Sequence, residues 1–140
     1  MTLEIGLLVA LAIAALCVVL MRRPGVSGLE AYRLVREGAR LVDVRSNAEF
    51  QAGHLLGAVH LPLSELASRV ADLGPGNADL VVYCETGHRS GRAARWLRGH
   101  GFARVHVLGA MGQWPGPWAV PRAPDPETPG ELAPPEANLS

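Results

Sequence analysis

The segment from Cys84 to Ser90 holds the residues of this chain that are most suited to chemistry. It reads Cys84-Glu85-Thr86-Gly87-His88-Arg89-Ser90. A cysteine acts as a nucleophile in its thiolate form, which backbone N–H groups, the positive end of a helix dipole and a nearby arginine all stabilise. We therefore expect the pKa of Cys84 to lie below that of a free cysteine. The segment predicts sulfur or phosphate chemistry, with Cys84 as the nucleophile.

Two elements must hold this segment in place. The apolar run Leu80-Val81-Val82-Tyr83 predicts a buried strand that ends at the cysteine, and the residues from Ser90 to Arg98 predict a helix that begins at a serine cap. Strands are expected at 40–44, 59–61, 80–83 and 104–108, and helices at 27–38, 64–73 and 90–98. This alternation predicts an α/β fold, a parallel sheet flanked by helices, with the reactive site at the carboxyl ends of the strands.

Length and charge limit the classes of function. The chain has 140 residues and a formal net charge of zero, so it offers no case for a nucleic-acid partner, and one folded domain is expected at 24–118. Its two cysteines are Cys17 and Cys84, and Cys17 lies in an apolar N-terminal segment. The two are not expected to pair, so any sulfur carried on Cys84 must pass to a partner outside the chain.

The N-terminal segment predicts a membrane anchor over 1–23. No charged residue occurs from Ile5 to Met21, which is long enough to span a bilayer as a helix. Arg22 and Arg23 follow, and the positive-inside rule places the rest of the chain in the cytoplasm, as a single-pass membrane protein. A cleaved signal peptide is the alternative, but its basic residues should precede the apolar run, where Glu4 stands instead.

The C-terminal composition differs from that of the domain. From Pro115 onward the chain holds most of its 11 prolines and four acidic residues. Such a composition cannot form a packed core, so we expect 119–140 to be a disordered tail rich in proline and acidic residues.

Further motifs flank the cysteine loop in a consistent order. They are Leu41-Val42-Asp43-Val44-Arg45, Glu49-Phe50, Gly53-His54-Leu55-Leu56-Gly57-Ala58-Val59-His60-Leu61-Pro62, and Gly101-Phe102 through Val107-Leu108-Gly109-Ala110-Met111 to Trp114. With the loop, they resemble the rhodanese-like single-domain sulfurtransferases over residues 26–118. The resemblance implies a rhodanese-like α/β fold, a persulfide formed on Cys84 and no cofactor. Its implied partners are a small sulfur donor and a thiol acceptor or acceptor protein.

The resemblance also implies roles for individual residues. The backbone N–H groups of Glu85, Thr86, Gly87, His88, Arg89 and Ser90 are expected to surround the transferred sulfur as a substrate and anion loop. Arg89 is expected to close this ring. Asp43, Arg45 and Glu49 match positions that brace the loop through pairs between arginine and carboxylate side chains.

Histidines are the other side chains of types that act in catalysis or bind metals. His54 and His60 follow the family pattern and are expected to be hydrogen-bonded framework residues. No metal site is expected, because Cys84 and the histidines lack the spacing of paired ligands. His88 lies in the loop itself, where it either tunes the charge of the thiolate or faces solvent.

Charged side chains near the loop bear on the choice of substrate. Glu85 stands where relatives that use thiosulfate often carry a basic side chain, and its carboxylate would repel a dianionic donor. Arg92, Arg95 and Arg98 share one face of the following helix, which is expected to be solvated. Arg92 is the member nearest the loop, where it can meet a substrate.

Two other functions stay open at the level of sequence. Cysteine phosphatases and arsenate reductases also join a cysteine to an arginine, but with one residue more than the four between Cys84 and Arg89. A ring this small should not hold a tetrahedral dianion. A non-catalytic module that docks a partner at the membrane is the second alternative, although docking needs no thiolate. We therefore expect a membrane-anchored sulfurtransferase or persulfide carrier.

Overall fold

The computed structural model describes residues 2–21 and 25–120 of the chain. The predictions for Arg22, Arg23 and 121–140 lie outside the described residues.

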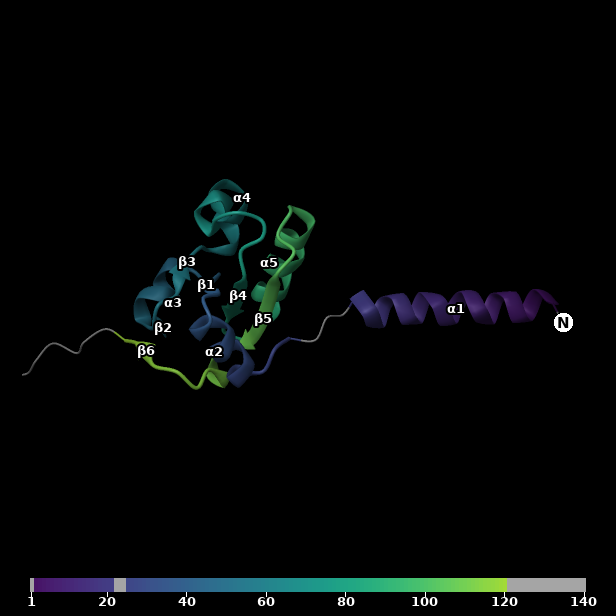
Figure 1. Ribbon diagram of the computed structural model, residues 1–140, viewed down its shortest axis with the longest axis horizontal. Coiled ribbons are helices and arrows are strands. Elements are labelled where there is room, and N and C mark those ends of the chain that lie inside the picture. Colours follow the sequence, from purple (N-terminus) through teal and green to yellow (C-terminus); the bar gives the residue numbers. More distant parts are fainter. Residues whose placement is uncertain (1, 22–24, 121–140) are drawn as a thin grey trace, which may run out of the picture.

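A parallel sheet of four strands forms the centre of the domain, in the order β3-β1-β4-β5 (Figure 1). Its strands are β1 (Arg40–Asp43), β3 (Val59–His60), β4 (Leu80–Cys84) and β5 (Val105–Ala110). Each neighbouring pair is parallel, which confirms the predicted α/β architecture. β4 is an inner strand whose residues are all buried, so its carboxyl end, at Cys84, is enclosed by neighbouring elements.

Helices cover both faces of this sheet. On one face lie α4 (Leu66–Arg69) and α5 (His88–Gly99), and on the other lies α2 (Gly28–Arg36), whereas α3 (Asn47–Ala52) packs beside residues 54–55. Side chains alternate in direction along a strand, so Val82 and Cys84 of β4 pack in a core with α4 and α5, whereas Val81 and Tyr83 pack in a second core with α2. The cysteine and the tyrosine that precedes it therefore point to opposite faces.

The predicted helices at 27–38 and 64–73 are present in altered form. α2 begins after Ser27, whose hydroxyl oxygen accepts the Glu30 N–H at 3.2 Å, as the capping pattern predicts. The segment 64–73 is less regular than predicted, because α4 is a short α-helix between 3₁₀ turns at 63–65 and 70–73.

Some elements have no counterpart among the sequence predictions. α3 is one, and a small antiparallel sheet of β2 (His54–Leu55) and β6 (Trp118–Ala119) is another. β6 lies after Pro115, in the segment whose composition predicts disorder. Its pairing with β2 nevertheless orders residues 118–119. The expected boundary at 118 therefore falls inside a strand.

α1 (Thr2–Met21) is helical, as the apolar run predicts, and lies apart from the sheet in Figure 1. Its described side chains, from Glu4 to Val19, are exposed. Of the helices formed by the described residues, none has the length and apolar character needed to cross a membrane, so the predicted transmembrane anchor is not supported. The predicted cytoplasmic placement of the domain stays a prediction.

Candidate active site

Cys84 is the last residue of β4, and its side chain is fully buried. The strand directs it toward α5, where Ala93 and Ala94 belong to the same core. An apolar setting by itself raises the pKa of a thiol, because burial disfavours the charged form. The polar contacts of Sγ therefore decide whether Cys84 is a thiolate.

Groups from the following loop point at this sulfur. The Gly87 N–H donates to Sγ at 3.0 Å and the Ser90 N–H at 3.4 Å, and the Ser90 hydroxyl also lies 3.4 Å from Sγ. Burial raises the pKa of Cys84, but the Ser90 hydroxyl and the N–H groups of Ser90, Gly87 and Thr86 outweigh it, so the pKa is lowered from its ordinary value. This direction agrees with the sequence prediction.

The loop turns into α5 at Gly87, which is the N-cap residue of the helix. Gly87 has a φ of 97°, in the left-handed region, and a Cβ at this position would lie 3.3 Å from the Cα of Gly109 in β5. Glycine is therefore required both by the turn and by the close approach to β5. The prediction that Ser90 caps the helix is wrong, because the helix begins at His88 and the Ser90 hydroxyl instead contacts Sγ and the Gly87 carbonyl.

Arg89 is held by Glu49 of α3. Two hydrogen bonds of 2.6 and 2.8 Å join their side chains in a bidentate pair. Glu49 also forms a capping box with Ser46, and the bonds from Arg89 and Ser46 hold the pKa of Glu49 well below its usual range. Arg89 was expected to close a ring around the sulfur, but its guanidinium group instead ties the loop to α3. Its charge still attracts the Cys84 thiolate.

A buried ion pair lies behind the loop. The Asp43 carboxylate is fully buried and accepts hydrogen bonds from the backbone N–H and the guanidinium group of Arg45, which is 4% exposed. The Tyr83 hydroxyl donates to Asp43 at 2.6 Å and accepts the Leu55 N–H at 3.1 Å. The pKa of Tyr83 is raised, mainly by burial and next by the hydrogen bond to Asp43, so its hydroxyl stays protonated.

The network extends from Arg45 to the loop. Arg45 donates to the Gly53 carbonyl at 2.6 Å, and its Nη1 lies 3.6 Å from a carboxylate oxygen of Glu85. Glu85 is 59% exposed, so this is a solvated contact. The carboxylate expected to repel anions therefore lies beside a cation. Asp43 pairs with Arg45 and Glu49 pairs with Arg89 of the loop, and a bracing role for these residues stays a prediction.

Sequence reasoning misses Tyr83 as a member of the site. The residue belongs to the apolar run that predicts β4, and its hydroxyl is the one polar side-chain group in that run. Because side chains alternate along a strand, a tyrosine directly before Cys84 must point away from the sulfur. The available signal was therefore a buried hydroxyl that needs a polar partner on the opposite face.

The histidines occupy framework and surface positions. His54 and His60 stack against Phe50, with ring centroids 3.7 and 4.3 Å apart. His54 Nδ1 donates to the Phe50 carbonyl and His60 Nε2 to the Arg45 carbonyl, both at 2.9 Å, which confirms the prediction of hydrogen-bonded framework residues. His88 is exposed at the start of α5. In the part of the chain that the structure describes, no group of three or more acidic, histidine or cysteine side chains is arranged to hold a metal ion.

Two cavities lie beside the loop. One of about 430 Å³ is bordered by residues 44–46, which follow β1, by residues 62–64 and by Arg89 and Arg92 of α5. The other, of about 320 Å³, is bordered by Glu49, Glu85 and the apolar Trp118. Arg45 borders both cavities. Arginine side chains predominate in the first and carboxylates in the second, so the loop lies between a more basic cavity and a more acidic one.

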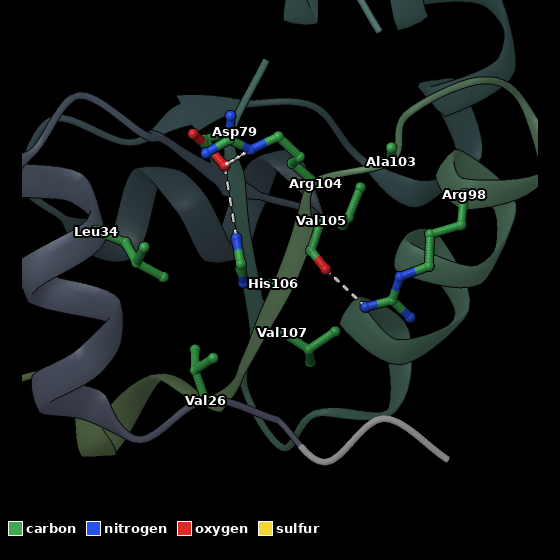
Figure 2. A pocket seen from close by; sticks show the side chains of 9 residues that line it. All are labelled: Val26, Leu34, Asp79, Arg98, Ala103, Arg104, Val105, His106 and Val107. Carbon is green, nitrogen blue, oxygen red and sulfur yellow. Dashed lines mark hydrogen bonds and ion pairs between the residues drawn. The ribbon is translucent and has the colours of Figure 1, made fainter. Parts of the chain in front are cut away.

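A further cavity of about 260 Å³ lies along β5 at the other end of the sheet (Figure 2). Asp79, directly before β4, forms an ion pair with Arg104 at 2.7 Å and lies 3.6 Å from His106. Arg98 donates to a carbonyl group of β5. These residues gather at the amino ends of β4 and β5, whereas Cys84 lies at the carboxyl end of β4, so this cavity is separate from the cysteine site.

Known proteins match this chain in sequence and in fold. Residues 28–115 match the family model of the rhodanese-like domain. The chain is 39% identical over 88 residues to the uncharacterized protein YqhL of Bacillus subtilis, covering 62% of this chain and 69% of that protein. It is 39% identical over 85 residues to the thiosulfate sulfurtransferase GlpE of Pseudomonas entomophila, covering 59% and 75%.

A solved structure shows the same likeness. The human single-domain sulfurtransferase TSTD1 matches with a TM-score of 0.57 and 32% sequence identity, over 65% of this chain and 94% of that chain. The family model covers more than half of the chain, and it includes the cysteine loop, the Asp43 strand and α3. This chain therefore belongs to the rhodanese-like domain family.

Proposed function

We propose that this protein is a sulfurtransferase or persulfide carrier that moves sulfane sulfur from a donor, through a Cys84 persulfide, to a thiol or another nucleophilic acceptor. The observation that carries the proposal is the environment of Cys84, whose sulfur is buried yet contacted by N–H and hydroxyl donors at 3.0 to 3.4 Å. Relatives such as GlpE, which is named as a thiosulfate sulfurtransferase, support the same chemistry.

In the first half of the cycle, the Cys84 thiolate attacks the outer sulfur of the donor. A new S–S bond forms to Sγ, the bond between that sulfur and the rest of the donor breaks, and its electron pair leaves with the remaining part of the donor. The product is the Cys84 persulfide. The N–H groups of Gly87 and Ser90 already point at Sγ, and they supply preorganised dipoles where the negative charge lies.

In the second half, an acceptor thiolate attacks the outer sulfur of the persulfide and Sγ leaves as a thiolate. The same contacts that lower the pKa of Cys84 make it a good leaving group, because thiols of lower pKa leave faster. The other cysteine in the sequence, Cys17, belongs to α1 and precedes the domain. The acceptor is therefore a separate molecule.

The charged residues around the loop act as supports in this proposal. Asp43 holds Arg45, and Glu49 holds Arg89, so each arginine is fixed by a carboxylate away from the sulfur. Glu85 affects which sulfur donor the protein can use, because a carboxylate beside the loop repels dianionic thiosulfate. Arg45 offsets this repulsion in part.

The alternatives from the sequence have less support. A cysteine phosphatase or arsenate reductase needs the loop arginine to hold the oxyanion, whereas the Arg89 guanidinium is bound to Glu49 through two hydrogen bonds. A docking module gives no reason for a buried cysteine with a lowered pKa.

Mass spectrometry of the full-length protein tests the proposal. The protein is exposed to thiosulfate, mercaptopyruvate or low-molecular-weight persulfides, and the Cys84→Ser and Cys17→Ser variants are treated alongside. We expect one added sulfur on the wild type and on Cys17→Ser, and none on Cys84→Ser. The proposal fails if no donor adds sulfur to Cys84 and if Cys84→Ser leaves the rate of sulfur transfer unchanged.

A further inference from the structure

The 430 Å³ cavity beside the loop lies directly next to the reactive cysteine. Asp43 of β1 is paired with Tyr83 of β4, so the following residues, Val44 and Cys84, are neighbours across the two strands, which are about 4.8 Å apart. Val44 lines the cavity and shares a buried core cluster with Cys84. Val44 therefore forms the part of the cavity wall that packs against Cys84, which does not itself line the cavity.

Three arginines line the cavity, but only one adds an uncompensated charge. Arg45 is paired with Asp43 at 2.8 Å, and Arg89 is paired with Glu49 at 2.6 Å. Arg92 is exposed, and within the described ranges it has neither an ion pair nor a hydrogen bond. The cavity thus carries a single free positive charge, at Arg92.

Helix geometry places this charge beside the cysteine loop. Arg92 follows Arg89 by three residues, so the two side chains share one face of α5. Ser90, whose hydroxyl contacts Sγ, precedes Arg92 by two residues, so the two side chains leave the helix in different directions, Ser90 toward the sulfur and Arg92 toward the cavity. Arg89, the residue directly before Ser90, borders the cavity together with Arg92, so this face of α5 adjoins the loop that holds the sulfur.

We propose that this cavity binds the sulfur acceptor, that the acceptor is a small thiol with a single carboxylate, and that Arg92 holds the carboxylate. The proposal rests on the sulfur-transfer function proposed above. One free positive charge matches one negative charge, and the described residues that line the cavity include no acidic side chain to repel it. Leu63 and Pro62 supply an apolar wall for the carbon chain, and the volume lies within the range of small-molecule sites, about 300–1,000 Å³.

The transfer step is balanced without a further reactant. The acceptor thiolate R–S⁻ attacks the outer sulfur of Cys84–S–SH, and a new S–S bond forms. The bond to Sγ breaks, its electron pair returns to Sγ, and the products are R–S–SH and the Cys84 thiolate. Arg92 touches only the carboxylate, so its contribution is to binding.

A comparison of two acceptors tests the role of Arg92. Full-length protein is loaded with sulfur on Cys84, separated from the donor, and mixed with mercaptopropionate or with its uncharged amide. The rate of persulfide loss is measured against acceptor concentration for the wild type, for Arg92→Gln and for Arg95→Gln. Arg95 is an exposed arginine of the same helix and serves as the matched control.

We expect Arg92→Gln to raise the half-saturating concentration of mercaptopropionate about three- to tenfold, with the limiting rate unchanged. The amide should bind this variant as it binds the wild type, and Arg95→Gln should resemble the wild type with both acceptors. Equal effects on both acceptors, or none on mercaptopropionate, overturn the proposal. A wild type that takes up no sulfur overturns the proposed function as well, and the missing mass shift identifies that cause before any acceptor is added.

Discussion

Replacing Asp43 by asparagine should expose the dependence of the fold on its buried charge pair. The Asp43 carboxylate accepts hydrogen bonds from the backbone and guanidinium groups of Arg45 and from the Tyr83 hydroxyl. Asparagine keeps the shape, but its NH₂ group replaces an oxygen that accepts from one of these donors. Arg45 then lies buried beside a neutral side chain, and the solvated Glu85 at 3.6 Å is a poor substitute for Asp43.

The burial of the pair sets the size of the effect. Asp43 and Arg45 are 0% and 4% exposed, and removal of one partner from a pair this deeply buried costs about 3–5 kcal/mol. The ion pair between Arg69 and Asp72 has side chains that are 41% and 51% exposed, so Asp72→Asn should cost less than about 1 kcal/mol. For Asp43→Asn we expect a fall in Tm of more than about 10 °C.

Urea unfolding followed by tryptophan fluorescence measures both variants at neutral pH. The double variant Asp43→Asn with Arg45→Met should be less destabilised than Asp43→Asn alone, because it removes the uncompensated charge. If Asp43→Asn costs no more than Asp72→Asn, the reasoning about the buried pair is refuted. Asp43 makes no hydrogen bond to Sγ, so the folded variant should still accept sulfur on Cys84.

Three further substitutions test the loop. Ser90→Ala removes the hydroxyl 3.4 Å from Sγ, so the pKa of Cys84 should rise and its alkylation at neutral pH should slow; a titration of thiolate absorbance identical to that of the wild type contradicts this. Gly87→Ala places a Cβ at positive φ against β5 and should cost about 1–3 kcal/mol in urea unfolding, whereas Gly91→Ala, where a Cβ meets nothing within 4 Å, should be neutral or stabilising. Equal stability of these two variants argues against a strained turn. Glu85→Arg should raise kcat/KM for thiosulfate, and an unchanged value would show that the carboxylate points away from the donor.

The sheet and the position of the cysteine are predictable because they depend on local patterns. The apolar run before Cys84 is long enough to specify β4, and the alternation of strands and helices specifies a parallel sheet with its site at the carboxyl ends. β2 and β6 have two residues each, which is too short for any periodicity to show. Their pairing depends on tertiary packing.

The partners of the loop side chains are harder to predict. The sequence shows that Arg89 and Glu49 carry opposite charges, but they are 40 residues apart, and their pairing depends on where α3 packs. Gly87 and Ser90 are both good N-cap residues, and the approach of Gly87 to β5 helps to explain why it takes that position. The Ser46–Glu49 capping pattern that predicts α3 is visible in the sequence, and it is the signal that could have located this helix.

The most direct test of the central claim is peptide mass spectrometry of Cys84 before and after a cycle of donor and thiol. The account predicts that a persulfide donor adds the mass of one sulfur atom to the peptide that contains Cys84, and that a thiol acceptor then removes it and appears as its own persulfide. An unchanged Cys84 peptide with every donor contradicts the account, as does sulfur transfer at the wild-type rate by Cys84→Ser.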